Sequence, residues 1–250
     1  MFSRAAHGPS GRPFRSLSLV AAAGGRPFGS FGITGYIARI IDVDVLGDPY
    51  RLRILSDGQQ YADPDGDAER AGISCAQWPL FGQLWPAGQS LAEAMSVDAV
   101  AGKRILELGC GIGLASLVLQ RRGADVLATD VHPMAETFLA YNAALNGLPA
   151  VQFRRLDWTR ARPELGRFDL IIAGDVLYER GQAEALAGVI LDYAADGADV
   201  VVTDAGRGYA SKLTAALAAR GFVHRPPIAL PLPLRGPVAT MRFEREWVAA

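Results

Sequence analysis

Three acidic residues in the middle of the chain are placed as the residues of a ligand site often are. Glu107 lies within a short apolar run, Asp130 ends a second run, and Asp175 follows a third. Runs of this length and composition are typical of buried parallel strands. Because the carboxyl ends of parallel strands meet at one edge of a sheet, we expect the three carboxylates to gather at that edge.

Glycines alternate directly after the first apolar run. Gly109, Gly111 and Gly113 form the pattern G-x-G-x-G, and helical spacing begins at Leu114. Glycine permits positive φ and lets the backbone approach a ligand closely. An acidic residue at the end of the following strand, here Asp130, can accept hydrogen bonds from both ribose hydroxyls of an adenosine. The segment therefore predicts a βα unit that holds a nucleoside.

The glycine spacing separates two classes of cofactor. Dinucleotide sites use G-x-G-x-x-G with a pyrophosphate at the helix N-terminus, whereas the third glycine comes one residue earlier here. Glu107 would oppose a pyrophosphate but suits a ligand with a cationic amino acid moiety. We therefore predict a site for S-adenosylmethionine, with a dinucleotide cofactor or a ligand-free turn as alternatives. We interpret Cys110, inside the loop, as a small packing residue rather than a reactive thiol, and we expect no metal.

Two further segments place polar side chains after predicted strands. Asp157 could accept a hydrogen bond from an adenine amino group, and Trp158 could cover the ring. After the fourth strand, Gly174 would let cofactor and acceptor approach, and Asp175 and Tyr178 would lie beside the transferred methyl group. Methyl transfer from a sulfonium depends mainly on positioning. A lysine acceptor, with a free pKa near ~10.4, must first lose a proton, which a carboxylate and an aromatic wall can assist.

The segment 174–178 also excludes one class of enzyme. Methyltransferases of planar amides or exocyclic base amines carry Asn/Asp-Pro-Pro-aromatic at this point, whereas this chain has Gly-Asp-Val-Leu-Tyr. Upstream, Trp85 begins the second of two Trp-Pro pairs and is expected to line the cofactor pocket, with an aromatic plug over the core as the alternative. His132 is interpreted as a loop-edge histidine rather than a general base.

Predicted strands and helices alternate along residues 72–250, which indicates an α/β fold. We expect a doubly wound, mostly parallel, Rossmann-like sheet of seven strands, with the ligand at the strand carboxyl ends. An N-terminal hairpin extension is expected from 50–55 paired with 59–61 across the turn Ser-Asp-Gly. The expected strands are 105–108, 125–129, 151–155, 168–173, 199–203, 222–230 and 239–245, and the expected helices 86–95, 114–122, 134–146, 181–194 and 211–220.

Composition divides the 250 residues into three parts. Residues 1–41 hold five arginines and no acidic residue, which predicts a disordered basic leader, or alternatively a transit peptide. Residues 42–71 would form the hairpin and a loop, and 72–250 the S-adenosylmethionine-dependent methyltransferase domain. A net charge of −1 does not indicate a nucleic-acid partner. No apolar run approaches the ~20 residues of a membrane span.

The two cysteines favour a reducing compartment over a disulfide framework. We therefore expect a cytoplasmic protein, or one of the mitochondrial matrix if the leader is a transit peptide.

Several motifs together resemble a known family. Segments 84–89, 106–111, 156–158 and 175–178 are similar to the seven-strand, class I protein-lysine methyltransferases. With 204–207, they look most like the members that methylate the electron transfer flavoprotein β subunit. The resemblance implies a protein substrate, such as that subunit or a translation or chaperone protein. It also implies an acceptor side made of Asp175 and Tyr178, and these cofactor contacts: Trp85, Gly109 to Gly111, Asp130, Trp158 and Gly174.

Three functions remain open from the residues alone. The enzyme could methylate a lysine in a protein, it could methylate a small amine or pyridine, or the fold could serve as a non-catalytic binding subunit. A protein-modifying enzyme is expected to leave Asp175 and Tyr178 at an open rim, whereas a small-molecule enzyme is expected to bury them. Three carboxylates at one sheet edge argue against the non-catalytic subunit.

Overall fold

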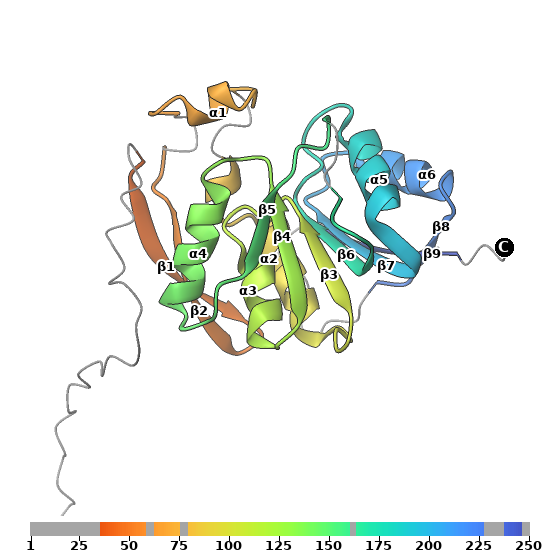
Figure 1. Ribbon diagram of the computed structural model, residues 1–250, viewed down its shortest axis with the longest axis horizontal. Coiled ribbons are helices and arrows are strands. Elements are labelled where there is room, and N and C mark those ends of the chain that lie inside the picture. Colours follow the sequence, from red (N-terminus) through yellow and green to blue (C-terminus); the bar gives the residue numbers. More distant parts are fainter. Residues whose placement is uncertain (1–35, 59–62, 76–79, 161–163, 228–237, 247–250) are drawn as a thin grey trace, which may run out of the picture. The chain divides into compact units, whose positions relative to one another are not determined.

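A mixed sheet forms the centre of the fold. The computed structural model describes residues 36–58, 63–75, 80–160, 164–227 and 238–246. Within these residues the main sheet has seven strands in the order β5-β4-β3-β6-β7-β9-β8 (Figure 1). Its strands are β3 (Arg104–Leu108), β4 (Asp125–Asp130), β5 (Gln152–Arg155), β6 (Phe168–Gly174), β7 (Ala194–Asp204), β8 (Phe222–Arg225) and β9 (Ala239–Arg245). The predicted seven-strand α/β fold is confirmed.

The direction of winding reverses at the middle of the sheet. From β3 the chain moves outward through β4 to β5, then returns to place β6 on the other side of β3, followed by β7. These five strands are parallel, and β9 is antiparallel to both β7 and β8. The crossover connections contain α3 (Leu114–Arg121), α4 (Ala135–Leu145) and α5 (Gln182–Tyr193).

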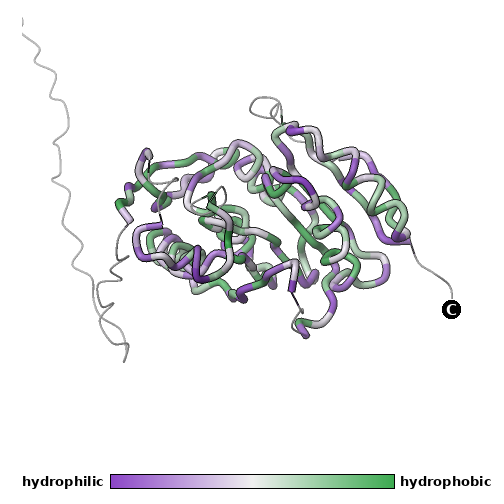
Figure 2. The backbone as a smooth tube through the Cα atoms, turned by 90° about the horizontal axis from the view of Figure 1, so that it is seen from above, coloured by the Kyte–Doolittle hydropathy of each residue, from purple (hydrophilic) through white to green (hydrophobic). Residues whose placement is uncertain are grey.

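Helices cover both faces of the sheet because its strands are apolar on both sides. Alternate residues of β3 face opposite cores, so that Ile105 packs with α2 (Pro86–Val97), α3 and α4, while Leu106 packs with α5 and α6 (Ala210–Ala218). Figure 2 shows the strands that run through the middle of the molecule as largely hydrophobic. The two cores fix the strand ends, which carry the polar residues.

The predicted N-terminal hairpin is present, but the partner strand found lies upstream of the one expected. Strand β2 (Asp48–Leu55) pairs with β1 (Ala38–Val45), upstream of it, and the expected partner 59–61 lies outside the described residues. Leu46 and Gly47 form the two-residue turn with φ of 52° and 99°, as a type I′ hairpin requires. The arginine-rich composition of 1–41 concealed the alternating pattern at its end. Consequently the expected boundary at residue 42 falls inside β1.

Asn142 in α4 and Asn146, the residue that caps the C-terminus of α4, attach the hairpin to the domain. The side-chain amide of Asn142 accepts from the backbone N–H of Arg53 at 2.6 Å and donates to its carbonyl at 3.3 Å. Asn146, one turn later, makes the same pair of bonds with Arg51 at 2.9 and 2.7 Å. The helix thus satisfies the outer edge of β2 much as a neighbouring strand would.

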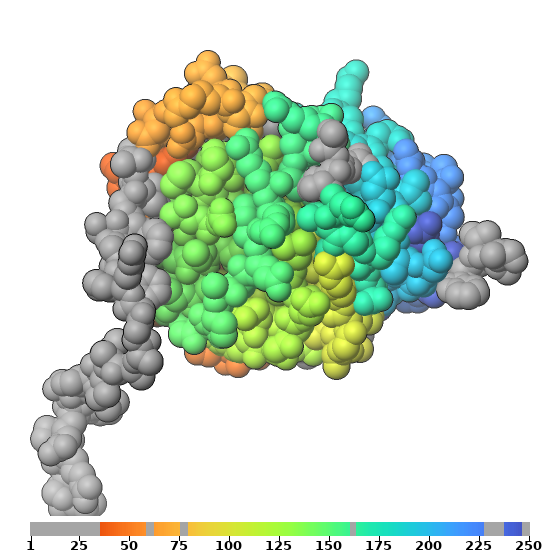
Figure 3. Space-filling model, viewed as in Figure 1, coloured from red at the N-terminus to blue at the C-terminus, as the bar shows by residue number. Residues whose placement is uncertain are grey.

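The polar segment 63–72 was expected to be a loop and contains a short helix, α1 (Asp67–Arg70). The carboxylate of Asp63 accepts hydrogen bonds from the backbone of Ala68 and Glu69 at 3.1 and 2.9 Å, which stabilises this turn. In the space-filling view, the orange segment that carries α1 covers one end of the molecule (Figure 3).

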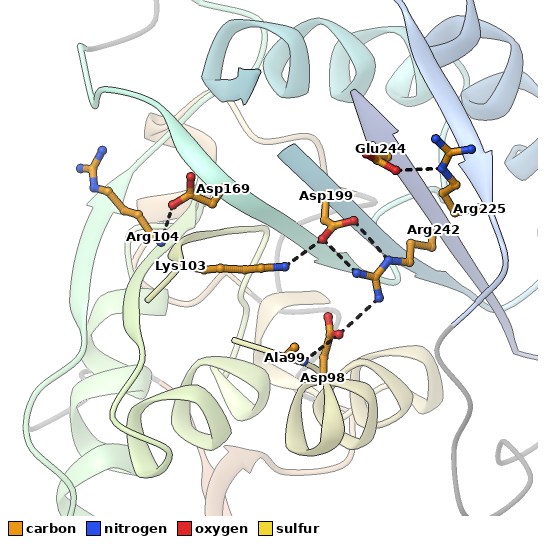
Figure 4. A network of polar contacts seen from close by, with 9 residues as sticks. All are labelled: Asp98, Ala99, Lys103, Arg104, Asp169, Asp199, Arg225, Arg242 and Glu244. Carbon is orange, nitrogen blue, oxygen red and sulfur yellow. Dashed lines mark hydrogen bonds and ion pairs between the residues drawn. The ribbon is translucent and has the colours of Figure 1, made fainter. Parts of the chain in front are cut away.

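An ion-pair network joins the amino-terminal ends of the central strands to the C-terminal strand (Figure 4). Asp199 in β7 accepts from Lys103 at 2.8 Å and from Arg242 of β9 at 2.9 Å. Arg242 also reaches Asp98, at the end of α2, at 3.2 Å. Burial alone would lower the pKa of Arg242, but its carboxylate partners raise it. The network fixes β9 against the sheet, away from the strand ends described next.

Among the described residues, no helix is both long and apolar enough to cross a membrane.

Candidate active site

A cavity of about 730 Å³ lies at the carboxyl ends of β3, β4 and β6. This is the point where the winding of the sheet reverses, and open α/β sheets bind ligands at such points. Its volume is in the range of small-molecule sites. Every residue predicted for the site lines the cavity except Gly113. The predicted residues that line it are Trp85, Glu107, Gly109, Cys110, Gly111, Asp130, Asp157, Trp158, Gly174, Asp175 and Tyr178.

The glycine loop leaves no room for side chains. Gly109 and Gly111 have φ of 70° and 54°. A Cβ on Gly109 would lie 2.8 Å from a methyl carbon of Val176, and one on Gly111 would lie 2.8 Å from the carbonyl oxygen of Phe81. The backbone of this loop therefore forms a wall of the cavity directly.

Gly113 has a different role from the one expected. It caps the N-terminus of α3 with φ of 85°, and an added Cβ would lie 2.2 Å from Leu139 of α4. The glycine lets α3 and α4 approach closely, and it does not line the cavity. The alternating glycine pattern could not reveal this role, because the contact of Gly113 is with Leu139, a residue of another helix.

Asp130 links the second strand to the glycine loop. One carboxylate oxygen accepts from the backbone N–H of Gly111 at 2.9 Å, and the other from the N–H of His132 at 2.8 Å. Burial raises the pKa of Asp130, and these two hydrogen bonds oppose that shift. Each oxygen retains a lone pair, so the carboxylate can still accept from hydroxyl groups of a ligand.

Glu107 is a buried carboxylate at the end of β3. Its side chain accepts a hydrogen bond from the hydroxyl of Ser116, in the first turns of α3. Burial raises the pKa of Glu107 to about 7, and the charge of Asp130 adds to the effect. A cation in the cavity would stabilise the ionised form, because a nearby opposite charge favours it.

Cys110 is buried within the loop, and its backbone N–H donates to Thr129 at 2.9 Å. Burial raises the pKa of its thiol well above the ordinary value, and the charges of Asp130 and Glu107 add to this. A thiol with a raised pKa carries little thiolate and is a poor nucleophile. The geometry agrees with a packing role.

Asp157 and Trp158 follow β5 at one side of the cavity. The Asp157 carboxylate accepts from the backbone N–H and the hydroxyl of Thr159 at 2.9 and 2.7 Å, and pairs with Arg160 at 2.9 Å. Burial alone would raise the pKa of Asp157, but these partners lower it. The side chain is therefore ionised, and Trp158 beside it approaches the glycine loop near Gly109.

Trp85 and Gly174 meet the cavity from α2 and β6. Trp85 precedes the first turn of α2, and its indole N–H donates to the carbonyl of Leu80 at 2.8 Å. A Cβ on Gly174 would lie 3.2 Å from both Gly88 and Leu91 of α2. The absence of a side chain at Gly174 thus allows β6 to pack closely on α2 at the cavity floor.

Asp175 has a constrained backbone and a charged partner. Its φ of 59° is uncommon for a residue other than glycine, and its N–H donates to Thr203 of β7 at 2.9 Å. Its two carboxylate oxygens face the two terminal nitrogens of the Arg207 guanidinium, the longer contact being 3.4 Å. The side chain of Asp175 is 2% exposed, whereas that of Arg207 is 35% exposed. The open rim expected for Asp175 is therefore absent, because Arg207 covers it.

Tyr178 is half-buried, three residues beyond Asp175. Burial raises the pKa of Tyr178 to about 12, and the charge of Asp130 contributes. The backbone N–H groups of Tyr178 and Glu179 both donate to the side chain of Gln182 in α5, at 2.8 and 2.7 Å. A neutral phenol is thus held on the same wall as Asp175.

Arg207 and His132 line the cavity and were not among the residues predicted for the site. Arg207 entered the sequence analysis only in the segment 204–207. The signal that could have found it is that β6 and β7 are parallel neighbours, so that the residues after their ends lie side by side. His132 is buried rather than at a loop edge, and it stacks on Phe81 with ring centroids 3.8 Å apart. Burial lowers the pKa of His132 to about 4. Its Nδ1 accepts from Met134 at 3.1 Å, and no partner for its Nε2 is found among the described residues.

In comparisons with known proteins, residues 73–213 match a family model described as "Lysine methyltransferase". The rat electron transfer flavoprotein β subunit lysine methyltransferase is 35% identical over 121 residues, covering 47% of each chain. The zebrafish protein N-lysine methyltransferase METTL21A is 35% identical over 120 residues, covering 45% of this chain and 51% of its own. The chain therefore spans about half the length of these curated relatives.

A solved structure supports the fold. The T. thermophilus 16S rRNA N2 G1207 methyltransferase, in complex with AdoMet and guanosine, matches with a TM-score of 0.57 and 20% identity. The match covers 84% of this chain and 50% of that one. At this identity the likeness establishes the shared fold alone.

Proposed function

Because this chain belongs to the lysine methyltransferase family, we propose that its cavity binds S-adenosylmethionine and directs the methyl group to the side-chain amine of a lysine in a protein. The observation that carries the proposal is the convergence of Glu107, Asp130 and Asp175 on one cavity at the switch point of the sheet. Two of these carboxylates suit the cofactor and the third suits the acceptor.

The residues of the strand ends fit S-adenosylmethionine. Asp130 has lone pairs for ribose hydroxyls, and Glu107 is a buried carboxylate that a cationic amino group would stabilise. Asp157 and Trp158 offer an acceptor and an aromatic surface for adenine. Gly109 and Gly111 bring the backbone to the cavity wall without side chains. When bound, the cofactor supplies a methyl group attached to a positively charged sulfur.

The acceptor side consists of Asp175 and Tyr178. A lysine arrives mainly as an ammonium ion at neutral pH and must release a proton to solvent before its lone pair is available. Asp175 can then accept a hydrogen bond from the amine and orient it, because its own backbone is fixed by Thr203. The half-buried Tyr178 excludes water from one side, which favours the neutral amine.

A protein acceptor is supported by several curated relatives, whose names specify a lysine of the electron transfer flavoprotein β subunit or of a protein. That subunit is the first acceptor to test, and translation or chaperone proteins follow. Methylation of a small amine is the second candidate function, and the burial of Asp175 favours it. A lysine side chain is nevertheless long and thin enough to enter a cavity that a protein surface cannot.

We place the protein in a reducing compartment, the cytoplasm first and the mitochondrial matrix second. Both cysteines are free, Cys75 exposed and Cys110 buried, which supports this placement.

Tritiated S-adenosylmethionine added to an extract of the source organism tests the function. Wild-type protein should transfer label to a discrete protein band, and Asp175→Asn should transfer far less. Label confined to the small-molecule fraction would instead establish the small-amine alternative. Absence of transferred label from every fraction, with the cofactor bound, would contradict a catalytic role.

A further inference from the structure

We infer that Arg207 sets the charge of the acceptor subsite: by pairing with Asp175 it prevents that carboxylate from holding the acceptor amine as an ammonium ion, and so keeps the amine in its reactive neutral form. The inference rests on the proposed function, since it concerns the same acceptor. It makes Arg207 a positioning residue that acts through Asp175.

The geometry of the pair supports this role. Both oxygens of Asp175 face the guanidinium of Arg207, and the carboxylate is almost completely covered. Asp175 cannot turn away, because its N–H is bonded to Thr203 and its backbone is in the left-handed region. Each carboxylate oxygen has a second lone pair, so the pair can still accept one N–H from a neutral amine.

The surrounding charges explain why the pairing is needed. Glu107 and Asp130 line the same cavity, and the anionic Glu179 and the cationic Arg180 follow Tyr178 on the acceptor wall. Asp204, at the end of β7, is fully buried and acts on Arg207 together with Asp175. The neighbouring segment of α2 presents no charge here, since Gly88 and Leu91 are its residues at the cavity.

Without Arg207, the Asp175 carboxylate would lose the guanidinium that pairs with it, and its charge would act directly on the acceptor amine. A buried carboxylate within about 4–6 Å of an amine favours the ammonium form by ~1–3 pKa units. An ammonium ion has no lone pair and cannot attack the methyl group. The guanidinium neutralises Asp175, so the amine loses its proton to solvent, its lone pair forms the new N–C bond, and the S–C bonding electrons remain on sulfur.

The test compares Arg207→Gln with the wild-type protein, using n-butylammonium as a probe of the lysine side chain. Its affinity is measured at neutral pH by protein NMR titration, in the protein alone and with S-adenosylhomocysteine. We expect Arg207→Gln to bind the cation about tenfold more tightly or better, as one or more pKa units imply. Arg207→Lys, which keeps the charge, should stay near wild type.

Arg220→Gln is the matched control. Arg220 also pairs with a carboxylate, Glu184, at 3.0 Å and is 28% exposed, but it lies outside the cavity. Its loss should not change the affinity for n-butylammonium. Equal affinities in wild type and Arg207→Gln, or weaker binding in the variant, would overturn the inference. Failure of all variants to bind S-adenosylhomocysteine would contradict the proposed function instead, while the titration of the protein alone still decides the role of Arg207.

A second readout is the pH profile of methyl transfer to the labelled acceptor. The rate should rise with pH until the bound amine is neutral. The profile of Arg207→Gln should shift to higher pH by about one unit or more, and that of Arg207→Lys should not. A merely structural loss would lower the rate without moving the profile, and superimposed profiles would overturn the inference.

Discussion

The carboxylate of Asp130 accepts a hydrogen bond from the backbone N–H of Gly111 at 2.9 Å, which joins the end of β4 to the glycine loop after β3. The proposed ribose contact and the proposed cofactor wall are therefore held as one unit. A substitution at Asp130 or at Gly111 should therefore alter the position of the other residue.

Asp130→Ala should weaken the binding of S-adenosylmethionine by about 1.5–3 kcal/mol, the range for hydrogen bonds to a charged group. Isothermal titration calorimetry measures this directly. Asp125→Ala is the matched control, because Asp125 begins the same strand at its exposed end. An unchanged affinity in Asp130→Ala would remove this residue from the cofactor site.

Glu107 should make the ligand-free protein less stable as the pH rises. Burial raises the pKa of Glu107 to about 7 from 4.5, so the folded state binds more protons than the unfolded chain between these values. The free energy of unfolding therefore falls as pH increases through this range, by up to about 3 kcal/mol. Glu107→Gln should lose this dependence in urea unfolding at several pH values, whereas Glu136→Gln, at an exposed position of α4, should retain it.

The same carboxylate should couple cofactor binding to proton release. Near neutral pH, a cationic ligand that favours ionised Glu107 should drive its proton into the buffer. Calorimetry in two buffers of different ionisation enthalpy reports the number of protons released, which should drop in Glu107→Gln. If the wild-type protein releases no protons on binding, and its unfolding has the same pH dependence as that of Glu107→Gln, then Glu107 is already ionised in the ligand-free protein.

The fold built around the main sheet was predictable because its signals are local. Each buried strand is an apolar run, and the glycine loop marks one βα unit. The upstream partner of β2 was missed because Leu46-Gly47 is a weaker turn signal than Ser-Asp-Gly. The contacts that Asn142 and Asn146 make with the other edge of β2 join segments far apart in the chain, so no local pattern predicts them. Arg207 was overlooked because its partner is 32 residues away in the chain, and that pairing arises from the alignment of β6 and β7.

The hairpin should contribute to stability, so the melting temperature of a shortened chain should depend on whether β1 is kept whole. A chain starting at residue 36 should unfold at the same temperature as the full chain. A chain starting at residue 42 loses residues 38–41, which pair with 52–55, and also the buried Tyr36. Its melting temperature should fall by about 2–4 °C or more, as a loss of ~1 kcal/mol or more implies for a domain of this size. Identical melting of both truncated chains would show that the first half of β1 adds nothing.

Asp175→Asn should lower kcat by about 10²-fold or more while leaving the affinity for S-adenosylmethionine unchanged, because the lost contact belongs to the acceptor in the transition state. Tyr178→Phe should cost less, since the ring still excludes water. Steady-state kinetics on the labelled acceptor, with calorimetry of the cofactor, gives both quantities. Normal turnover of Asp175→Asn would show that the acceptor does not bind at Asp175 and must be assigned to another wall of the cavity.

The most direct measurement of the central claim is tandem mass spectrometry of a protein acceptor after incubation with the wild-type protein and S-adenosylmethionine carrying a deuterated methyl group. The electron transfer flavoprotein β subunit is the first acceptor, followed by the band labelled in the extract. The account predicts deuterated methyl groups on the side-chain nitrogen of a lysine, and strongly reduced labelling with Asp175→Asn. Methyl groups on another residue type, or an unlabelled protein alongside a methylated small amine, would contradict it.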